Sequence, residues 1–538
     1  MTPCRLAPIG ALVALVLGAR PAAAQTPDSS SADSSSARIR AIEIRTDDVF
    51  PDSEAHGLIP ALANGLHFTT RDGIVRRELL LRPGDMYDSA RVAETERNLR
   101  ALRVFQLVRI DSVRTDSGLI LQVRTRDAFS TRADARLKLS GGSTTWSVAL
   151  DELNLLGTAT LLGVRYRKEP DRTAVLTQFQ RQRLIAGTVG ISALYDRRSD
   201  GRVEYAALTK PFFSLSTPMS WYATGEERDE RILRFYEGNP MARDTLSRRF
   251  WLGSAGVSFA PIASPRGYVR WGVAGQIRRD DYAVERVRDT LAHTLTGAVG
   301  AYLQWRSARF LVSEGFAGFG RQEDIDLSTL VHVGVYLTPR AFGYAEDGVV
   351  PTIALGTGIG WRGGFARLNA SALGRFTSAG LDSGSVSIGG MAVIKPNLRN
   401  MVVFHASHGW QRRSAPGAEF DLGLDVGPRG FDAHAFTGDR AFLLTTEYRY
   451  TLTDNLLRSA GLGLAAFADY GGAWYHGSPR RTGYSVGVGL RFGLTIASGL
   501  EPVRVDLARI GGDGIGRPRW ALAIGKGFVF NTSGRLNR

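Results

Sequence analysis

Five consecutive segments near the C-terminus alternate between apolar and polar residues with a period of two. They are 441–450, 461–472, 484–494, 503–507 and 520–530. On each segment one face is apolar, and the other carries mainly small or charged residues. Side chains of a β-strand point alternately to two faces. The pattern therefore predicts strands that separate an apolar environment from a polar one.

Two architectures use such strands. A soluble β-sandwich or propeller buries the apolar faces in a dry core, whereas a transmembrane barrel turns them toward lipid. Three features favour the barrel. The segments are about 9–11 residues long, which is the length of a tilted strand that crosses a bilayer. Aromatic residues lie near the segment ends, and Glu, Arg and Asp share one face with Gly, as suits a wet lumen.

We therefore predict a mainly β chain with a transmembrane antiparallel β-barrel over residues 128–530. From about residue 130 helical periods vanish and glycine becomes dense. The spacing of the segments predicts about 16 to 20 strands, and an even number if both ends are periplasmic. No segment has the ~18 uninterrupted apolar residues of a membrane helix. In a membrane, only a closed barrel would then satisfy the backbone polar groups.

Residues 1–24 have the features of a secretory signal peptide. Arg5 gives the positive start, Leu6–Gly18 the apolar run, and Ala22–Ala24 a small-residue cleavage site. A short anchor helix is the alternative, but the run is too short for a bilayer of roughly 30 Å. The only cysteine, Cys4, lies in this segment. The mature chain would therefore lack a thiol for disulfides, metal sites or nucleophilic catalysis.

Between signal and barrel, the sequence predicts a disordered Ser-rich linker (25–37) and a small mixed domain (38–127). In this domain alternation indicates strands, and apolar spacing with a capping residue indicates helices. The expected elements are a strand around Ile42 and Ile44, a helix over 53–66, an extended piece over 74–81, a helix starting at Asp88 or Ser89, and strands around 108–110 and 119–123.

The chain is basic, with a formal net charge of +15, which becomes +13 (15 − 2) if Arg5 and Arg20 leave with the signal. Acids are interleaved with the bases, and no block of Lys or Arg occurs. Motifs typical of nucleic-acid binding are also absent. We interpret the charges as lumen and loop groups that also meet anionic lipid headgroups, and expect no nucleic-acid partner.

The sequence contains no convincing constellation for catalysis. Gly384–Gly389 has the wrong spacing for a nucleophile elbow. His405 and His408 are three apart in a predicted strand and point to opposite faces, which excludes a simple shared metal site. The glycines of 356–360 and 487–489 echo nucleotide loops, but in a period-two context they are small lumen-facing positions. We expect no enzymatic activity, no cofactor and no metal.

Several longer strings occur in a consistent order. Leu80–Asp88, Arg97–Leu102 and Phe105–Ile110 lie in the small domain. The predicted barrel contains Asn154–Thr158, Gly427–Phe431, Glu447–Arg449, Phe467–Gly471, Gly487–Arg491 and Gly525–Phe530. In this order they resemble the BamA/TamA outer-membrane assembly-factor superfamily, also called the bacterial surface antigen family. The small domain resembles a POTRA (polypeptide-transport-associated) domain.

The resemblance implies a barrel of sixteen strands and a long extracellular loop that folds into the lumen. It also implies that the barrel assembles or translocates polypeptides. Only one POTRA domain fits before the barrel, fewer than in the best-known members. The tail 531–538 extends beyond the aromatic end of the C-terminal assembly signal, which comprises Gly525, Phe528 and Phe530.

The loop signature Arg429-Gly430-Phe431 suggests a latch. Glu447 and Asp469 lie, by alternation, on the lumen face of nearby strands. A guanidinium can bridge two carboxylates with its five rigid donors. We therefore predict that Arg429 holds the loop inside the barrel, the alternative being an exposed loop charge.

Other residues support the same lumenal site. Gly430 allows a tight turn, and Phe431 is expected to pack against Phe467. Arg504 and Asp506 form an ion pair rather than an acid–base site in this interpretation. The further charges predicted in the lumen are Arg449, Arg491, Arg504 and Asp506.

The first barrel strand, near 135–141, and the last, 521–530, must close a seam. Lys526 is expected on the lipid side, and Gly525 and Gly527 weaken the packing of the last strand. A weak seam can open sideways to receive a nascent strand. An exposed edge of the POTRA sheet can likewise capture an unfolded client by backbone pairing.

Three functions are compatible with these features. The first is assembly or translocation of polypeptides, the second a pore for small polar solutes with a structural POTRA domain, and the third an enzyme. The POTRA strings and the Arg-Gly-Phe loop favour the first, because a plain porin needs neither. The expected location is the outer membrane, with the POTRA domain in the periplasm. Expected partners are outer-membrane lipids and lipopolysaccharide, unfolded outer-membrane or secreted polypeptides, and periplasmic accessory proteins.

Overall fold

The structure, a computed structural model, covers most of the chain after the first 36 residues. The predicted signal peptide, the linker up to residue 36, the predicted helix 53–66 apart from 64–65, and the tail 531–538 lie outside the described residues. The described residues are 37–50, 64–65, 67–116, 118–185, 188–236, 239–240, 245–284, 289–320, 322–424, 426–456, 459–495 and 501–530.

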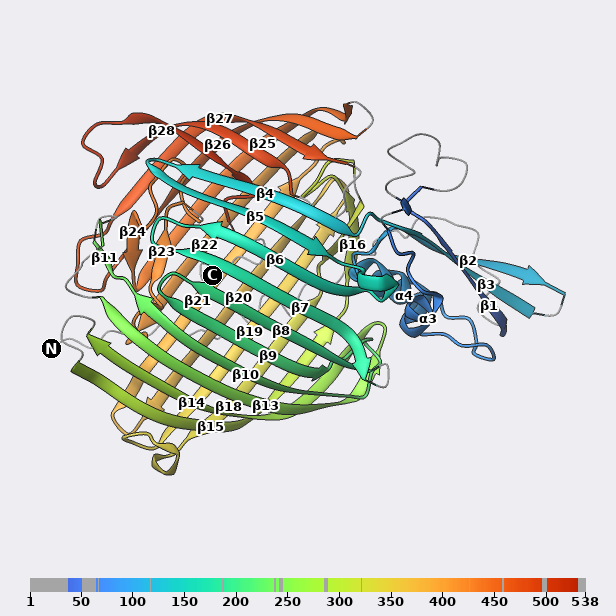
Figure 1. The fold of residues 1–538 in the computed structure, drawn as a ribbon, viewed down its shortest axis with the longest axis horizontal. Helices are drawn as coiled ribbons and strands as arrows, with labels where there is room; N and C mark the ends of the chain where they lie inside the picture. The colour runs from blue at the N-terminus through green and yellow to red at the C-terminus, as the bar shows by residue number, and fades with distance from the viewer. Residues whose placement is uncertain are drawn as a thin grey trace.

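Twenty of the described strands form one closed barrel, shown from the side in Figure 1. Consecutive strands pair in antiparallel fashion, and the last strand returns to the first. The barrel strands are β4 (Thr131–Ser140), β5 (Ser143–Glu152), β6 (Thr160–Lys168), β7 (Thr173–Ile185), β8 (Val189–Arg198), β9 (Gly201–Lys210), β10 (Met219–Ile232), β13 (Leu246–Ser264), β14 (Gly267–Val284), β15 (Asp289–Ser307), β18 (Thr329–Thr338), β19 (Gly348–Trp361), β20 (Gly364–Thr377), β21 (Gly380–Ile394), β22 (Asn400–Arg412), β25 (Arg440–Leu456), β26 (Ala460–Trp474), β27 (Thr482–Leu494), β28 (Val503–Gly512) and β29 (Arg519–Lys526).

The predicted fold class, a mainly β chain with a closed antiparallel barrel, is confirmed. Twenty strands is the upper end of the count from spacing, and the sixteen implied by the resemblance is too low. The five strands after the long connection 413–439 are the five alternating segments of the sequence. The uncertainty in the predicted number of strands therefore comes from the part of the barrel before that connection.

The two faces of the barrel wall differ as alternation predicts. On β15, Leu303 and Trp305 are exposed on the outer face, and Gln304 between them lies 3.3 Å from His332 of β18 on the lumen side. Large apolar side chains recur at the outer positions of most strands. Since water would oppose such exposure, this band is the surface that lipid covers.

Several strands are longer than the predicted 9–11 residues. The longest, β13–β15, have 18 or 19 residues. From Trp251 onward the outer face of β13 and β14 changes from apolar to charged: Arg279 is opposite Trp251, and Arg249 is opposite Asp281. These strands therefore extend past the apolar band, which explains why a length taken from the bilayer alone is too short.

The N-terminal unit adjoins one end of the barrel, which we call the proximal end (blue in Figure 1); the other is the distal end. It contains β1 (Ile39–Asp47), α3 (Asp72–Glu78), α4 (Ser89–Ala101), β2 (Phe105–Thr115) and β3 (Gly118–Asp127). The sheet order is β1-β3-β2, with β1 parallel and β2 antiparallel to β3. Among the described residues, no helix is both long and apolar enough to cross a membrane.

One helix of this unit agrees with the sequence and one does not. Asp88 caps α4 by accepting hydrogen bonds from two backbone N–H groups of its first turn, as its position predicts. Residues 74–81 were expected to be extended, but most of them belong to α3. Val75 is fully buried against Leu99 and Val123, so packing overrides the strand preference of its β-branched side chain.

Among the described residues, three pairs of short strands lie outside the barrel wall. β11 (Phe235–Tyr236) pairs with β12 (Asn239–Pro240), and β23 (Phe420–Leu422) pairs with β24 (Phe436–Gly438), both in distal connections. β16 (Phe310–Glu314) pairs with β17 (Gln322–Asp326) at the proximal end, as Figure 1 shows for β16 beside α4.

A pair of arginine substitutions tests which face meets lipid. Leu303→Arg places a charge between Trp271 and Val333 on the outer face and should destabilise the folded barrel by about 2–4 kcal/mol. Gln304→Arg, one residue along, points into the lumen and should cost much less. Urea titrations of protein folded into lipid vesicles measure both. Equal losses would contradict the assignment of the two faces.

Candidate functional site

The connection 413–439 enters from the distal end and folds into the lumen. Phe420, Leu422 and Phe436 are almost completely buried in one cluster with side chains of the barrel wall. On β22, Gly409 leaves the space that the Phe420 ring occupies. The loop is therefore packed against the wall rather than lying over the opening.

Arg429 lies at the tip of this loop and is only 2% exposed. Its Nε and Nη2 donate to Asp469 of β26 at 2.9 and 3.1 Å, and its backbone N–H donates to the same carboxylate at 3.2 Å. Its Nη1 lies 2.7 Å from Glu447 of β25 and 3.6 Å from Asp506 of β28. One guanidinium thus contacts carboxylates from three strands, which its planar fork permits.

Three further arginines complete the cluster. Arg491 lies 3.0 Å from Glu447 and 2.6 Å from Asp506. Arg504 lies 2.7 Å from Asp506, and Arg449 pairs with Glu447. The structure therefore brings together all seven charged residues that the sequence places in the lumen, and each buried charge has an opposite neighbour.

The expected packing of Phe431 against Phe467 differs in the structure. The guanidinium of Arg429 covers Phe467, 3.6 Å from the ring centroid. Phe431 lies instead 5.1 Å from Phe436 and fills the space left by Gly483 of β27. The arginine takes the aromatic face because a cation over a ring is favourable in a desolvated site.

The loop tip lies behind the seam between β29 and β4. The backbone N–H of Gly430 donates to Ser140 Oγ of β4 at 3.0 Å. At Gly430, where φ is +85°, an added Cβ would lie 2.8 Å from Ile510 of β28 and 2.9 Å from Ala521 of β29. The tip thus touches both sides of the seam, in a conformation and a space that suit only glycine.

Asp432 makes a second bridge across the seam. Its carboxylate accepts hydrogen bonds from the Gly142 backbone and, at 3.4 Å, from Ser143 Oγ in the β4–β5 turn. Arg519 of β29 lies 3.8 Å from the same carboxylate. The backbone N–H of Ala433 donates to Ser143 Oγ at 3.0 Å.

The seam itself is short of backbone pairing. β29 and β4 are in register at two positions, Ala523 with Ser140 and Ile524 with Leu139. By comparison, β28 and β29 are in register at eight positions and β4 and β5 at ten. The contacts from the lumen loop therefore reinforce the junction that has the fewest backbone contacts of its own.

The end of the last strand departs from the prediction. β29 ends at Lys526 rather than at residue 530, because Gly527 adopts φ +63° and turns the chain. Lys526 was expected to face lipid, but its ammonium bonds to Asp134 of β4. An unpaired ammonium is costly in a membrane, and a carboxylate across the seam removes that cost.

The predicted assembly-signal aromatics also lie elsewhere than on the outer face. Phe530 stacks on His405, a lumen-facing residue of β22, with ring centroids 4.0 Å apart. Phe528 lies 4.0 Å from the guanidinium of Arg449 and 5.0 Å from Phe530. Gly525 remains in β29 beside Arg504. The C-terminal segment 527–530 therefore turns into the lumen.

Comparisons with known proteins agree with this architecture. Residues 416–534, which contain the lumen loop and the last five strands, match the model of the Omp85 superfamily domain. Over these residues the chain is similar to the Omp85 superfamily domain. The resemblance predicted from the sequence is confirmed at this level, and the protein is an outer-membrane-type transmembrane barrel.

One sequence relative is similar to part of the chain, and two solved structures are similar to most of it. Over 139 residues it is 32% identical to the outer membrane protein assembly factor BamA of Neorickettsia risticii (strain Illinois), which covers 24% of this chain and 18% of that protein. Among solved structures, BamA from Haemophilus ducreyi lacking POTRA domains 1–3 has a TM-score of 0.42 at 10% identity, covering 91% of this chain and 84% of that one. CdiB from Escherichia coli has a TM-score of 0.49 at 12% identity, covering 92% and 77%.

The Asn154–Thr158 motif docks the N-terminal unit on the barrel. Asn154, 1% exposed in the bend after β5, donates to Thr70 Oγ1 at 2.9 Å. The Gly157 carbonyl accepts from the Arg71 backbone at 3.0 Å, and Gly157 has φ +70°. The motif therefore fixes the segment that leads into α3.

Three polar side chains at the same junction superficially resemble a catalytic triad. His67 Nε2 lies 2.8 Å from Asp127, and its Nδ1 lies 3.2 Å from Ser130 Oγ. All three side chains are buried, and Asp127 also accepts from the Thr70 backbone at 2.6 Å. His67 and Asp127 belong to the N-terminal unit and Ser130 directly precedes β4, so the arrangement joins the unit to the barrel. No group of three potential metal ligands occurs in the part of the chain that the structure describes.

His434 forms a further ionic contact of the lumen loop. Its Nε2 lies 2.9 Å from Asp171 in the β6–β7 connection, and its Nδ1 lies 2.6 Å from Asp421. Phe235 stacks on the imidazole with a centroid distance of 3.6 Å. Burial lowers the pKa of His434, but the hydrogen bonds with Asp171 and Asp421 outweigh it and raise the pKa to about 9.

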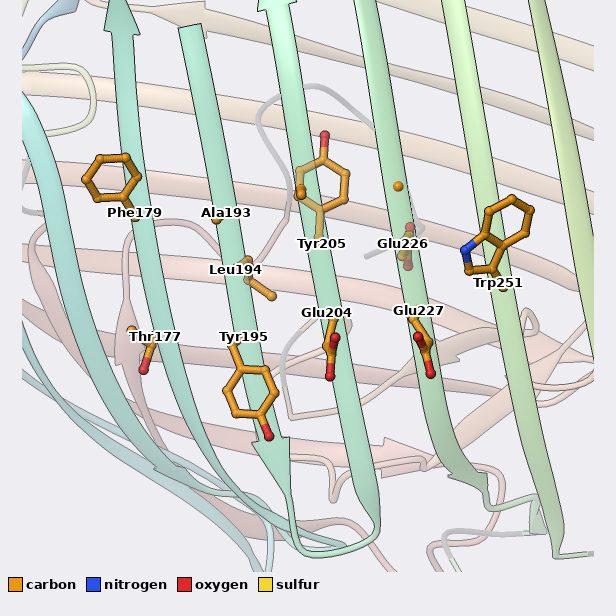
Figure 2. A pocket seen from close by; sticks show the side chains of 12 residues that line it. Thr177, Phe179, Ala193, Leu194, Tyr195, Glu204, Tyr205, Glu226, Glu227 and Trp251 are labelled. Atoms are coloured by element: carbon orange, nitrogen blue, oxygen red, sulfur yellow. The ribbon is translucent and has the colours of Figure 1, made fainter. Parts of the chain in front are cut away.

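A cavity of about 430 Å³ lies on the outer wall rather than in the lumen. Figure 2 shows Glu204 and Glu227 on neighbouring strands, in the row of Tyr195 and Trp251. Arg202 lies 3.3 Å from Glu204 and 3.1 Å from Glu227. This row marks the distal limit of the apolar band and is separate from the charged cluster.

Sequence reasoning missed the residues that join the loop to the seam. Ser140, Asp432 and Arg519 come from three distant parts of the chain, so no local pattern links them. Asp432 directly follows the Arg-Gly-Phe signature, and that adjacency was the available signal. His434 had no comparable one, because its carboxylate partners lie 13 and 263 positions away.

Removing the loop arginine should release the loop. Arg429→Ala leaves Asp469 buried with Ser485 as its remaining side-chain partner and should lower the free energy of unfolding by about 3–5 kcal/mol. Arg429→Ala combined with Asp469→Asn should recover part of this loss, since the orphaned charge is gone. Denaturant unfolding measures the energies, and protease cleavage within 413–439 reports loop release. A double variant no more stable than Arg429→Ala would argue against the pairing.

The His434 contact should weaken in alkaline solution. Because its pKa is raised when folded, its stabilisation is complete below the ordinary value of about 6.5 and is lost as pH rises through about 9. The shift corresponds to about 3 kcal/mol between pH 6 and pH 10. The denaturant midpoints of the natural protein and His434→Gln should therefore differ at pH 6 and converge at pH 10. A difference that does not depend on pH would refute the assigned contact.

Proposed function

We propose that this protein assembles or translocates polypeptides at the outer membrane, and that a client strand enters at the β29–β4 seam. The observation that carries the proposal is the pairing of these strands at two positions, against eight and ten at the neighbouring junctions. A sheet edge with unpaired backbone groups can accept another strand. In a closed barrel the seam is the place where such an edge can form.

The lumen loop acts as the latch of this seam. Arg429 anchors the loop to β25, β26 and β28, while Gly430 and Asp432 contact β4 and β29. Movement of the tip would remove the contacts that compensate for the short backbone pairing. The latch therefore couples loop position to seam opening.

The N-terminal unit is, in this proposal, a periplasmic POTRA domain that captures clients. Its sheet ends in β1 and β2, each of which pairs only with β3 within the described residues. An unfolded segment can add to such an edge through backbone hydrogen bonds, with little demand on its sequence. The proximal end of the barrel then faces the periplasm.

The proposed function implies three kinds of partner. Clients are unfolded outer-membrane or secreted polypeptides, periplasmic accessory proteins dock on the N-terminal unit, and lipids with lipopolysaccharide surround the apolar band. No cofactor enters the proposed mechanism. A pore for small polar solutes is the alternative outcome of the test below.

A disulfide across the seam should block assembly. Leu139→Cys with Ile524→Cys joins β4 to β29 at a register pair. Val505→Cys with Ile524→Cys is the matched control, since it joins β28 to β29 and leaves the seam free. In host cells depleted of the natural protein, the oxidised seam pair should lower the levels of several outer-membrane proteins, and the control pair should not.

Quantitative mass spectrometry of outer membranes reads out this experiment. Addition of a reductant should restore the levels in cells with the seam pair. Normal levels with a fully oxidised seam would refute entry at the seam. Loss of uptake of one solute on depletion, without loss of other membrane proteins, would favour the pore.

A further inference from the structure

The connection between β15 and β18 forms a hairpin inside the proximal mouth of the barrel. Its strands β16 and β17 pair with each other and not with the barrel wall. Phe316, Ile325 and Leu327 are buried in the same cluster as the lumen loop. The turn is held by Glu323, which accepts hydrogen bonds from the Phe316 and Ala317 backbone at 2.9 and 2.8 Å. The hairpin is thus an ordered insert.

The hairpin reaches across the lumen. Near its base, Leu327 contacts β19, where a Cβ added to Gly358 would lie 2.7 Å from the leucine side chain. Near its tip, the Phe319 ring occupies the space left by Gly461 of β26 and contacts Gly493 of β27. Strands β19 and β26 are separated by β20, β21, β22 and β25. The hairpin therefore crosses the lumen from β19 to β26.

The outer side of the hairpin contacts the N-terminal unit. Arg100 of α4 lies 3.1 Å from Asp324 of β17. The Arg97 guanidinium, one turn earlier, lies 4.4 Å from the centroid of the Phe310 ring in β16. A movement of α4 would therefore act directly on the hairpin.

The inner side contacts the C-terminal segment. The Phe316 ring lies 5.3 Å from Phe528 and 5.2 Å from Phe365 of β20. Phe528 in turn lies against Arg449 of the charged cluster. The hairpin thus sits between α4 on one side and the inturned end of the seam strand on the other.

We propose that the hairpin 308–328 is an internal plug. It closes the proximal mouth of the lumen and holds segment 527–530 inward, and displacement of α4 releases it. This role needs a barrel in a membrane but no polypeptide client, so it can fail or hold independently of the function proposed above.

Glycines of the wall give the sharpest test. Gly356 and Gly358 share the lumen face of β19, but only Gly358 lies against the hairpin; an added Cβ at Gly356 has Asn369 Oδ1 as its nearest neighbour, at 3.5 Å. Gly358→Leu should expel Leu327 and raise the conductance of the full-length protein in planar bilayers several-fold. Gly356→Leu, the matched control, should conduct like the natural protein.

A deletion guards against a failure of Gly358→Leu to fold. The Leu327 backbone N–H donates to the Arg309 carbonyl at 2.8 Å, so an Asn-Gly turn can replace 310–326 without opening the wall. This variant should also conduct several-fold more. If both variants fold, by circular dichroism and protease resistance, and conduct like the natural protein, the plug is refuted.

Charge reversal tests the link to α4. Asp324→Arg should repel Arg100 and raise the fraction of time in the open state, and adding Arg100→Glu should restore it. Both readouts are electrical, so they leave the client experiment untouched. An open fraction unchanged by Asp324→Arg, or one that Arg100→Glu fails to restore, would refute the control by α4.

Discussion

The need to pair backbone groups around the barrel is the constraint on which the rest of the structure depends. In hydrocarbon each unpaired N–H or C=O costs several kcal/mol, so a closed wall must be paired at every junction. The β29–β4 junction is in register at two positions. Gly430 and Asp432 reinforce it from the lumen, and the Lys526–Asp134 pair joins the strands directly. The loop 413–439 therefore contributes contacts that hold the barrel wall together at this junction.

The charged cluster explains how the loop finds one position. Burying four guanidiniums and three carboxylates costs desolvation energy, and well-packed apolar residues are often equally stabilising. What the charges add is specificity, because Arg429 fits only where carboxylates of β25, β26 and β28 converge. Directional hydrogen bonds allow only one position of the loop tip on the barrel wall, whereas an apolar tip could shift along the wall. That precision places Gly430 against both sides of the seam.

The sequence predicted correctly those features that depend only on which face of a strand a residue occupies. Glu447 and Asp469 were placed in the lumen because alternation fixes the face of every residue in a strand. Prediction failed where the chain leaves strand geometry, as at Gly527, or where packing overrides local preference, as at Val75. It also failed where a charge seeks a partner, since Lys526 has the parity of a lipid-facing residue but bonds to Asp134. Contacts between distant segments are the common cause.

Several glycines of the barrel wall lie where inserted segments of the same chain pack against the lumen face. A larger side chain would not fit at these positions, whereas an open pore would have no need of such matched gaps. The pairs are Gly358 with Leu327, Gly409 with Phe420, Gly461 with Phe319, and Gly483 with Phe431. The resting lumen is thus filled from both ends, while the junction with the fewest backbone pairs faces the membrane. In the proposed function a client strand enters at the seam, so it need not pass through the filled lumen.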